Sequence, residues 1–225
     1  MEIIKPGMFG TSYSADTKRR LFDFYNHQML TKGIRPDFLF IGYSITEYWD
    51  LYLYFPKAGF IANRGIGGDI SSIILKRFDA DALQLKPRNI IYLAGCNDLM
   101  ATHYDFWWKC PGRDEKEAKE ELLYNTEAII KKCKGINLYV CSVLPSSLCV
   151  PYDAQKFNDN IVEVNEKIQQ LCEKYSVTYI DYHSELCAVD GKTVKDNITY
   201  DGIHPTPEGY EIMAKVLKKY VKGIK

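Results

Sequence analysis

The stretch DFLFIGYSIT, residues 37–46, decides the fold of this 225-residue chain. Its first six residues, Asp37–Gly42, form a short apolar run that is typical of a strand buried on both faces of a sheet. A serine, Ser44, follows directly after the run. The pattern therefore predicts a buried strand that delivers a serine to one edge of a sheet.

Four further apolar runs recur along the chain, separated by segments with helical periodicity. The runs are Phe60–Asn63, Asn89–Ala94, Ile136–Val143 and Val177–Asp181. Apolar residues at steps of three and four predict amphipathic helices within Leu21–Met29, Ala118–Cys133 and Phe157–Tyr175, and a last helix that starts at Pro207 behind the N-cap Thr206. The alternation predicts an α/β fold, a three-layer α/β/α sandwich with a mainly parallel five-stranded sheet, in a single domain over residues 1–225.

The composition excludes several classes of partner. Lys+Arg and Asp+Glu are equal at 29 each, which gives no general electrostatic reason to bind nucleic acid. No segment approaches the ~20 apolar residues of a membrane span, and the first residues do not resemble a signal peptide, so we expect no membrane insertion and a cytoplasmic location. The seven cysteines are scattered without a Cys-x-x-Cys pair, which argues against both a disulfide framework and a zinc site.

Three residues have the chemistry of a nucleophilic triad. A serine needs a base to become a nucleophile, and the base needs an orienting partner. Ser44, His204 and Asp201 supply these three types of group. Two stretches between them, Arg64–Asp69 and Gly95–Asp98, offer hydrogen-bond donors for an oxyanion. All of these positions follow strands or precede the last helix, so we expect them at the carboxyl edge of the sheet.

Four motifs appear in the order found in the SGNH (GDSL-type) hydrolases, and the chain resembles that family over essentially its whole length. The first is Gly42–Thr46, the second supplies a glycine, most simply Gly68, the third is Gly95–Asp98, and the last is Asp201–His204. The resemblance implies the flavodoxin-like fold of these enzymes. It also implies that Ser44 is the nucleophile.

The same resemblance assigns the remaining roles at the site. His204 would be the general base and Asp201 its orienting carboxylate. The oxyanion hole would consist of the backbone N–H groups of Ser44 and Gly68 and the side-chain amide of Asn97. No metal or cofactor is expected. The glycines offer a rival interpretation as a phosphate-binding turn, but the dinucleotide fingerprint requires glycine where Ile70 stands.

One residue departs from the family pattern, and aromatic residues surround the motifs. The aspartate that precedes the nucleophile in the family, where it helps to organise hydrogen bonds around the serine loop, is Tyr43 here. Tyr43 is a candidate for lining the substrate pocket, or marks a weakened enzyme. Trp49, Trp107 and Trp108 are candidates for stacking on a sugar ring, with packing in the core or in a lid as the alternative.

We therefore expect a metal-independent serine esterase that hydrolyses small acyl esters, acetyl above all, through an acyl-enzyme on Ser44. An acetylated saccharide is one candidate substrate. The alternatives are a lysophospholipase or thioesterase of the same family, a catalytically weakened binding module on the same fold, and a nucleotide-binding protein that uses the glycine turn.

Overall fold

Five parallel strands form the centre of the molecule. The structure, a computed structural model, describes residues 3–5, 8–10, 12–102, 112–147 and 153–225. The strands are β1 (Phe38–Gly42), β2 (Ile61–Gly65), β3 (Asn89–Leu93), β4 (Asn137–Cys141) and β5 (Thr178–Ile180). Their order across the sheet is β2-β1-β3-β4-β5, and each neighbouring pair is parallel. The predicted α/β fold with a five-stranded parallel sheet is confirmed.

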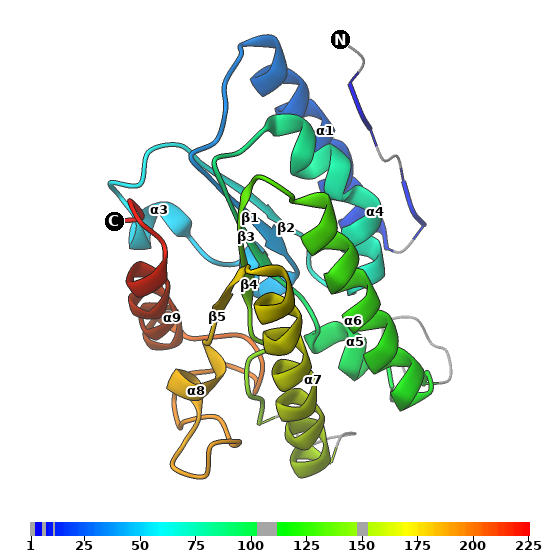
Figure 1. Cartoon of the computed structure of the whole chain (residues 1–225), viewed down its shortest axis with the longest axis vertical. Coiled ribbons are helices and arrows are strands. Elements are labelled where there is room, and N and C mark those ends of the chain that lie inside the picture. The colour runs from blue at the N-terminus through cyan, green and yellow to red at the C-terminus, as the bar shows by residue number, and fades with distance from the viewer. Residues whose placement is uncertain (1–2, 6–7, 11, 103–111, 148–152) are drawn as a thin grey trace.

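Helices cover both faces of this sheet. The described helices are α1 (Tyr13–Thr31), α2 (Ser44–Glu47), α3 (Leu51–Tyr54), α4 (Ser71–Asp81), the 3-10 turn η1 (Leu83–Leu85), α5 (Cys96–Met100), α6 (Glu115–Lys132), α7 (Ala154–Tyr175), α8 (His183–Leu186) and α9 (Pro207–Tyr220). Figure 1 shows α1, α4, α6 and α7 side by side on one face, with α3 and α9 on the other. This is the predicted three-layer sandwich. None of the described helices is long and apolar enough to cross a bilayer.

The longest helix illustrates how the sequence specifies its ends and its buried face. The Asp153 side chain caps α7 by accepting hydrogen bonds from the backbone N–H groups of Gln155 and Lys156. Residues at steps of three and four, from Phe157 to Cys172, are buried against the core. The start of α9 is likewise as predicted, because Pro207 occupies its first turn and the Thr206 hydroxyl caps it.

The parallel register brings three strand ends level with one another. Gly42 at the end of β1 pairs with Gly65 of β2 on one side and Leu93 of β3 on the other. The segments that follow these strands therefore leave the sheet at one edge. At Gly65 a Cβ atom would lie 2.2 Å from the backbone nitrogen of Glu47, so only glycine lets β2 pack this closely against α2.

Candidate active site

Ser44, His204 and Asp201 meet at the carboxyl edge of the sheet. Ser44 is the first residue of α2, and His204 lies in the loop before α9. The Ser44 Oγ lies 2.8 Å from His204 Nε2, and His204 Nδ1 lies 2.6 Å from Asp201 Oδ2. An ionised carboxylate only accepts hydrogen bonds, so Nδ1 carries the ring proton and Nε2 is left to accept the serine hydroxyl hydrogen. The arrangement has the hydrogen-bond geometry of a serine nucleophile with an oriented base.

Asp201 holds both the loop and the ring of His204. Its Oδ1 accepts the backbone N–H groups of Ile203, at 3.0 Å, and of His204, at 2.8 Å, while its Oδ2 faces the imidazole. Burial alone raises the pKa of Asp201, but these hydrogen bonds outweigh it and hold that pKa below its usual range. Asp201 is therefore an anion at neutral pH, as a carboxylate that stabilises an imidazolium must be.

The loops that carry the predicted oxyanion donors adjoin Ser44. A Cβ atom on Gly67 would lie 3.6 Å from the Ser44 Cβ, so the glycine turn is in van der Waals range of Ser44. Gly68 has a φ of +80°, a conformation that glycine adopts without strain. One hydrogen of the Asn97 amide is donated to the Asp69 backbone oxygen at 2.9 Å, which fixes the side chain and leaves its second hydrogen for another acceptor.

A buried ionic network lies directly behind these loops. Arg77, which has no exposed surface, donates to the backbone oxygens of Gly42 and Arg64 and to the carboxylates of Asp69 and Asp81. Asp69 also pairs with the buried side chain of Arg19. The network joins the ends of β1 and β2 to the segment that follows Gly68. Sequence reasoning missed Arg77, because no local pattern distinguishes it from a solvent-exposed helix residue.

A second buried carboxylate fixes the third loop. Asp98 accepts hydrogen bonds from the backbone N–H of Ser71, at 3.0 and 3.1 Å, and from its hydroxyl. Asn125 donates to the same hydroxyl at 3.0 Å. Burial raises the pKa of Asp98 to about 6, although the Ser71 hydrogen bonds act to lower it. Asp98 thus anchors its neighbour Asn97 to the start of α4.

Glu47 is a further polar residue near Ser44 that sequence reasoning missed. Its Oε2 accepts the Gly67 backbone N–H at 2.5 Å, and its Oε1 lies 3.0 Å from Lys18 Nζ. Because Glu47 is the last residue of α2, it ties the helix that begins with Ser44 to the glycine turn. Its only sequence signal is its position three residues after Ser44, one helical turn along.

The aromatic candidates lie in different places. Tyr43 has no exposed surface, and Trp49, 3% exposed, packs in the core against Tyr210 with ring centroids 5.3 Å apart. Burial of both side chains argues against direct contact with a substrate. Trp107 and Trp108 lie outside the described residues, so their predicted contact with substrate stays a prediction.

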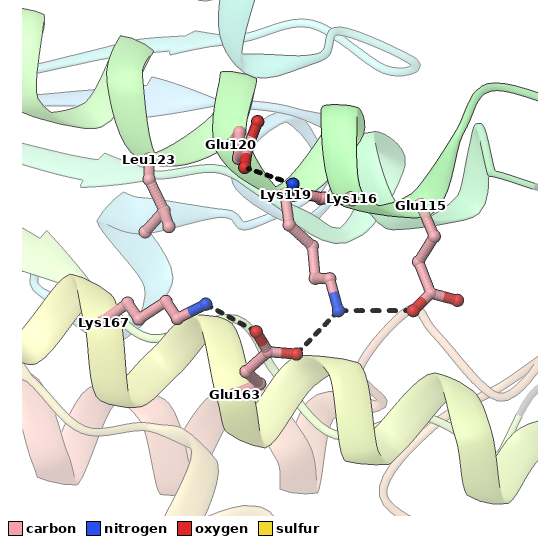
Figure 2. A pocket seen from close by; sticks show the side chains of 7 residues that line it. All are labelled: Glu115, Lys116, Lys119, Glu120, Leu123, Glu163 and Lys167. Carbon is pink, nitrogen blue, oxygen red and sulfur yellow. Dashed lines mark hydrogen bonds and ion pairs between the residues drawn. The ribbon is translucent and has the colours of Figure 1, made fainter.

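Among the described residues, one cavity adjoins the triad and another lies elsewhere. A cavity of about 220 Å³ has His204 in its wall together with residues of α3 and the start of α9. The other, of about 250 Å³, lies between α6 and α7. Figure 2 shows that its charged side chains are paired with one another, with Lys119 between Glu115 and Glu163. The second cavity is a groove closed by ion pairs, and the first is the one placed to receive a substrate.

Comparisons with known proteins agree with this geometry. Residues 40–212 match the model of the GDSL-like Lipase/Acylhydrolase family. A protein from Streptococcus pneumonia named after platelet activating factor is 27% identical, with a TM-score of 0.74 over 92% of this chain and 94% of that one. A GDSL-like lipase from Bacteroides thetaiotaomicron (24% identity, TM-score 0.71, 89% and 95% covered) and a catalytic mutant of an acetylxylan esterase from Geobacillus stearothermophilus (17%, 0.64, 85% and 98%) share the fold. No curated protein sequence matches the chain.

Proposed function

Because the chain belongs to the GDSL-like lipase/acylhydrolase family, we propose that it is a serine esterase that hydrolyses small acyl esters through an acyl-enzyme on Ser44. One observation carries the proposal, the continuous hydrogen-bonded line from the Ser44 hydroxyl through the His204 ring to Asp201. A binding module on the same fold would have no need to keep these three groups aligned.

The proposed reaction has two halves. In the first, His204 Nε2 takes the proton of Ser44 as Oγ attacks the ester carbonyl, and the oxyanion is met by donors from Ser44, Gly68 and Asn97. The imidazolium then gives its proton to the departing alcohol, which leaves an acyl group on Ser44. In the second half, His204 removes a proton from water, which attacks the acyl carbonyl and releases the acid. The His204 imidazole carries out every proton transfer, and the Asp201 carboxylate stabilises its cation, so the proposal requires no metal.

Acetyl is the acyl group that we favour. Two of the structurally similar proteins are acetylxylan esterases, which supports a small acyl group, although at 17% identity they share only the fold. An acetylated saccharide is one candidate for the substrate, and a lysophospholipase or thioesterase activity is the alternative within the family. A series of p-nitrophenyl esters distinguishes these, because an acetyl preference predicts falling kcat/KM from acetate to octanoate.

The decisive test compares p-nitrophenyl acetate hydrolysis by the wild-type protein with that by the Ser44→Ala variant. We expect a loss of about 10⁴-fold or more in kcat, because no other group replaces the nucleophile. Ser184→Ala, an exposed serine of α8, is the matched control and should keep the wild-type rate. Equal rates from the wild type and Ser44→Ala, with both proteins folded by circular dichroism, would refute the catalytic proposal and leave the binding module.

A further inference from the structure

The cavity beside His204 has an unusual lining. Its walls are formed by four tyrosines and two prolines with one carboxylate, one leucine and one histidine: Tyr48, Asp50, Leu53, Tyr54, Tyr200, His204, Pro205, Pro207 and Tyr210. Its volume of about 220 Å³ is below the ~300–1,000 Å³ of sites for drug-sized ligands. The cavity therefore suits a compact group of a few heavy atoms.

Because the cavity adjoins His204, it lies where the alcohol part of an ester would be bound. The general base must reach both the serine oxygen and the leaving oxygen, so the departing alcohol lies against the imidazole. His204 lines the cavity, whereas Gly68 and Asn97, the proposed oxyanion donors, do not. The Tyr48 ring packs against the His204 ring with centroids 5.4 Å apart, which continues the aromatic wall from the imidazole into the cavity.

Two of the four tyrosine hydroxyls in the wall are engaged with the protein itself. Tyr210 donates its hydroxyl hydrogen to the Ile45 backbone oxygen at 2.8 Å, and Tyr54 donates to the Pro207 backbone oxygen at 3.2 Å. These two side chains have thus used their donors, and what remains for a ligand is mainly the aromatic ring. At Tyr54 and Tyr210 a sugar would find no free hydroxyl donor, whereas a group that needs no hydrogen bonds loses nothing there.

The charge around the cavity is negative. Asp50 lies in the wall, and Glu208 and Glu211 of α9 act with it on the Tyr54 hydroxyl, whose pKa is raised by burial and then by these neighbouring carboxylates. Among the described residues that line the cavity there is no lysine or arginine. Aromatic rings and carboxylates both attract a cation, and both are unfavourable for an anion.

We propose that this cavity binds the alcohol part of the ester and that this alcohol carries a quaternary ammonium or similarly alkylated cationic group. The inference rests on the proposed function, since it names the substrate class of the same site. A trialkylated cation is compact, has no hydrogen bonds to satisfy, and gains from the tyrosine rings and from Asp50 together. A neutral sugar would gain from the rings but not from the charge of Asp50.

The test uses a pair of alcohols that differ only in charge. Choline and 3,3-dimethylbutanol have nearly the same shape, and their binding to the Ser44→Ala protein is measured by calorimetry, with hydrolysis of their acetate esters by the wild type measured in parallel. We expect about five-fold or greater preference for the cationic member of each pair, the size of a moderate cation–π contribution. The preference should shrink as salt is added.

Variants locate the effect. Asp50→Asn keeps the oxygen that accepts the Leu53 backbone N–H but removes the charge, and should reduce the preference about two-fold or more. Tyr200→Leu, which removes an exposed ring from the wall, should reduce it similarly. Asp114→Asn is the matched control, because Asp114 also caps a helix, α6, but does not line the cavity, and should leave the preference unchanged.

The outcomes separate this inference from the proposed function. If p-nitrophenyl acetate is not hydrolysed, the esterase proposal fails, while the binding comparison still decides the inference. Equal binding and hydrolysis of the paired compounds, or better competition by methyl xyloside than by choline, would overturn the cationic assignment. A preference that Asp50→Asn and Tyr200→Leu leave intact would show that the cation binds elsewhere and would overturn the site.

Discussion

Replacing Arg77 with methionine should destabilise the protein strongly, and the structure sets the size of the effect. The guanidinium makes hydrogen bonds at 2.7 Å to Asp69, 3.1 Å to Asp81, and 2.9 Å to the backbone oxygens of Gly42 and Arg64. Methionine has a similar length but no donors. The variant would leave two buried carboxylates short of a partner and two buried carbonyl oxygens without this donor.

The magnitude follows from what is left behind. Removing one partner of a buried ion pair costs about 3–5 kcal/mol, because the other charge stays buried without compensation. Asp69 keeps its pair with Arg19, which limits the loss, so we expect about 3–4 kcal/mol. Proteins of ordinary stability unfold with about 5–15 kcal/mol, so the variant should fold only marginally. With a urea m-value of about 2–3 kcal/mol/M, the midpoint should fall by about 1–2 M.

Urea unfolding followed by circular dichroism measures this loss. Lys132→Met is the matched control, because Lys132 also pairs with a carboxylate of α4, Asp79, at 2.8 Å, but both side chains are substantially exposed. Exposed pairs contribute about 0–1 kcal/mol, so the control should shift the midpoint little. A loss for Arg77→Met no larger than that for Lys132→Met, with unchanged m-values, would refute the view that this arginine holds the strand ends together.

Four further substitutions test the loops and the core around the site. Gly65→Ala should prevent stable folding, because the new Cβ would lie 2.2 Å from the Glu47 nitrogen. Soluble yield and thermal unfolding measure this effect. Gly68→Ala is the comparison, because a Cβ there would meet open space and should cost only about 1–2 kcal/mol for the positive φ. Burial raises the pKa of Asp98 to about 6, so the folded protein holds the Asp98 proton more tightly than the unfolded chain does. The resulting contribution to the free energy of unfolding, about 3 kcal/mol in total, is complete below the unfolded pKa of about 3.9 and is lost as pH rises through 6. Asp98→Asn should therefore give a flatter free energy of unfolding between pH 4 and 7, and an unchanged slope would contradict this. Tyr43→Phe should leave the free energy of unfolding unchanged or raise it by up to about 1 kcal/mol, since the Tyr43 hydroxyl is buried without a hydrogen-bond partner among the described residues. A fall of more than about 1 kcal/mol in urea unfolding would contradict this and indicate that the hydroxyl has a partner.

The sheet and most long helices were predictable because their signals are local. Each strand is a short apolar run, and α7 shows an apolar stripe along its whole length. Helix α4 was not predicted, and its composition gives the reason. Its buried face includes Ser71, Arg77 and Asp81, so polar residues interrupt the apolar stripe that would mark a helix packed on a sheet.

The proximity of Ser44, His204 and Asp201 was also predictable, whereas the contacts that hold their segments in place were not. The carboxyl ends of parallel strands lie at one edge of the sheet, so the segments that follow β1 and β2, with Ser44 and the glycine turn, lie close together there. The motif with Asp201 and His204 directly precedes α9. The contacts that hold them are pairings between distant segments, such as Lys18 with Glu47 and Arg19 with Asp69. Spacing in the sequence does not predict which charged residues form ion pairs with distant partners. Burial, which the sequence does not show either, decides how much each pair contributes to stability.

Tyr43, which precedes Ser44, is the residue on which the alternative of a weakened enzyme rests, and its surroundings support the proposed activity. Tyr43 turns its ring fully into the core, so it neither blocks the triad nor replaces the polar role of the aspartate found there in the family. Other residues make hydrogen bonds to this segment. Arg77 fixes the Gly42 backbone oxygen, Glu47 fixes the Gly67 N–H, and Asn63 donates to the backbone oxygen of Thr46 at 2.7 Å. These bonds brace the segment around Ser44 without the aspartate, and the Ser44 oxygen lies 2.8 Å from His204 Nε2, which supports the proposed activity.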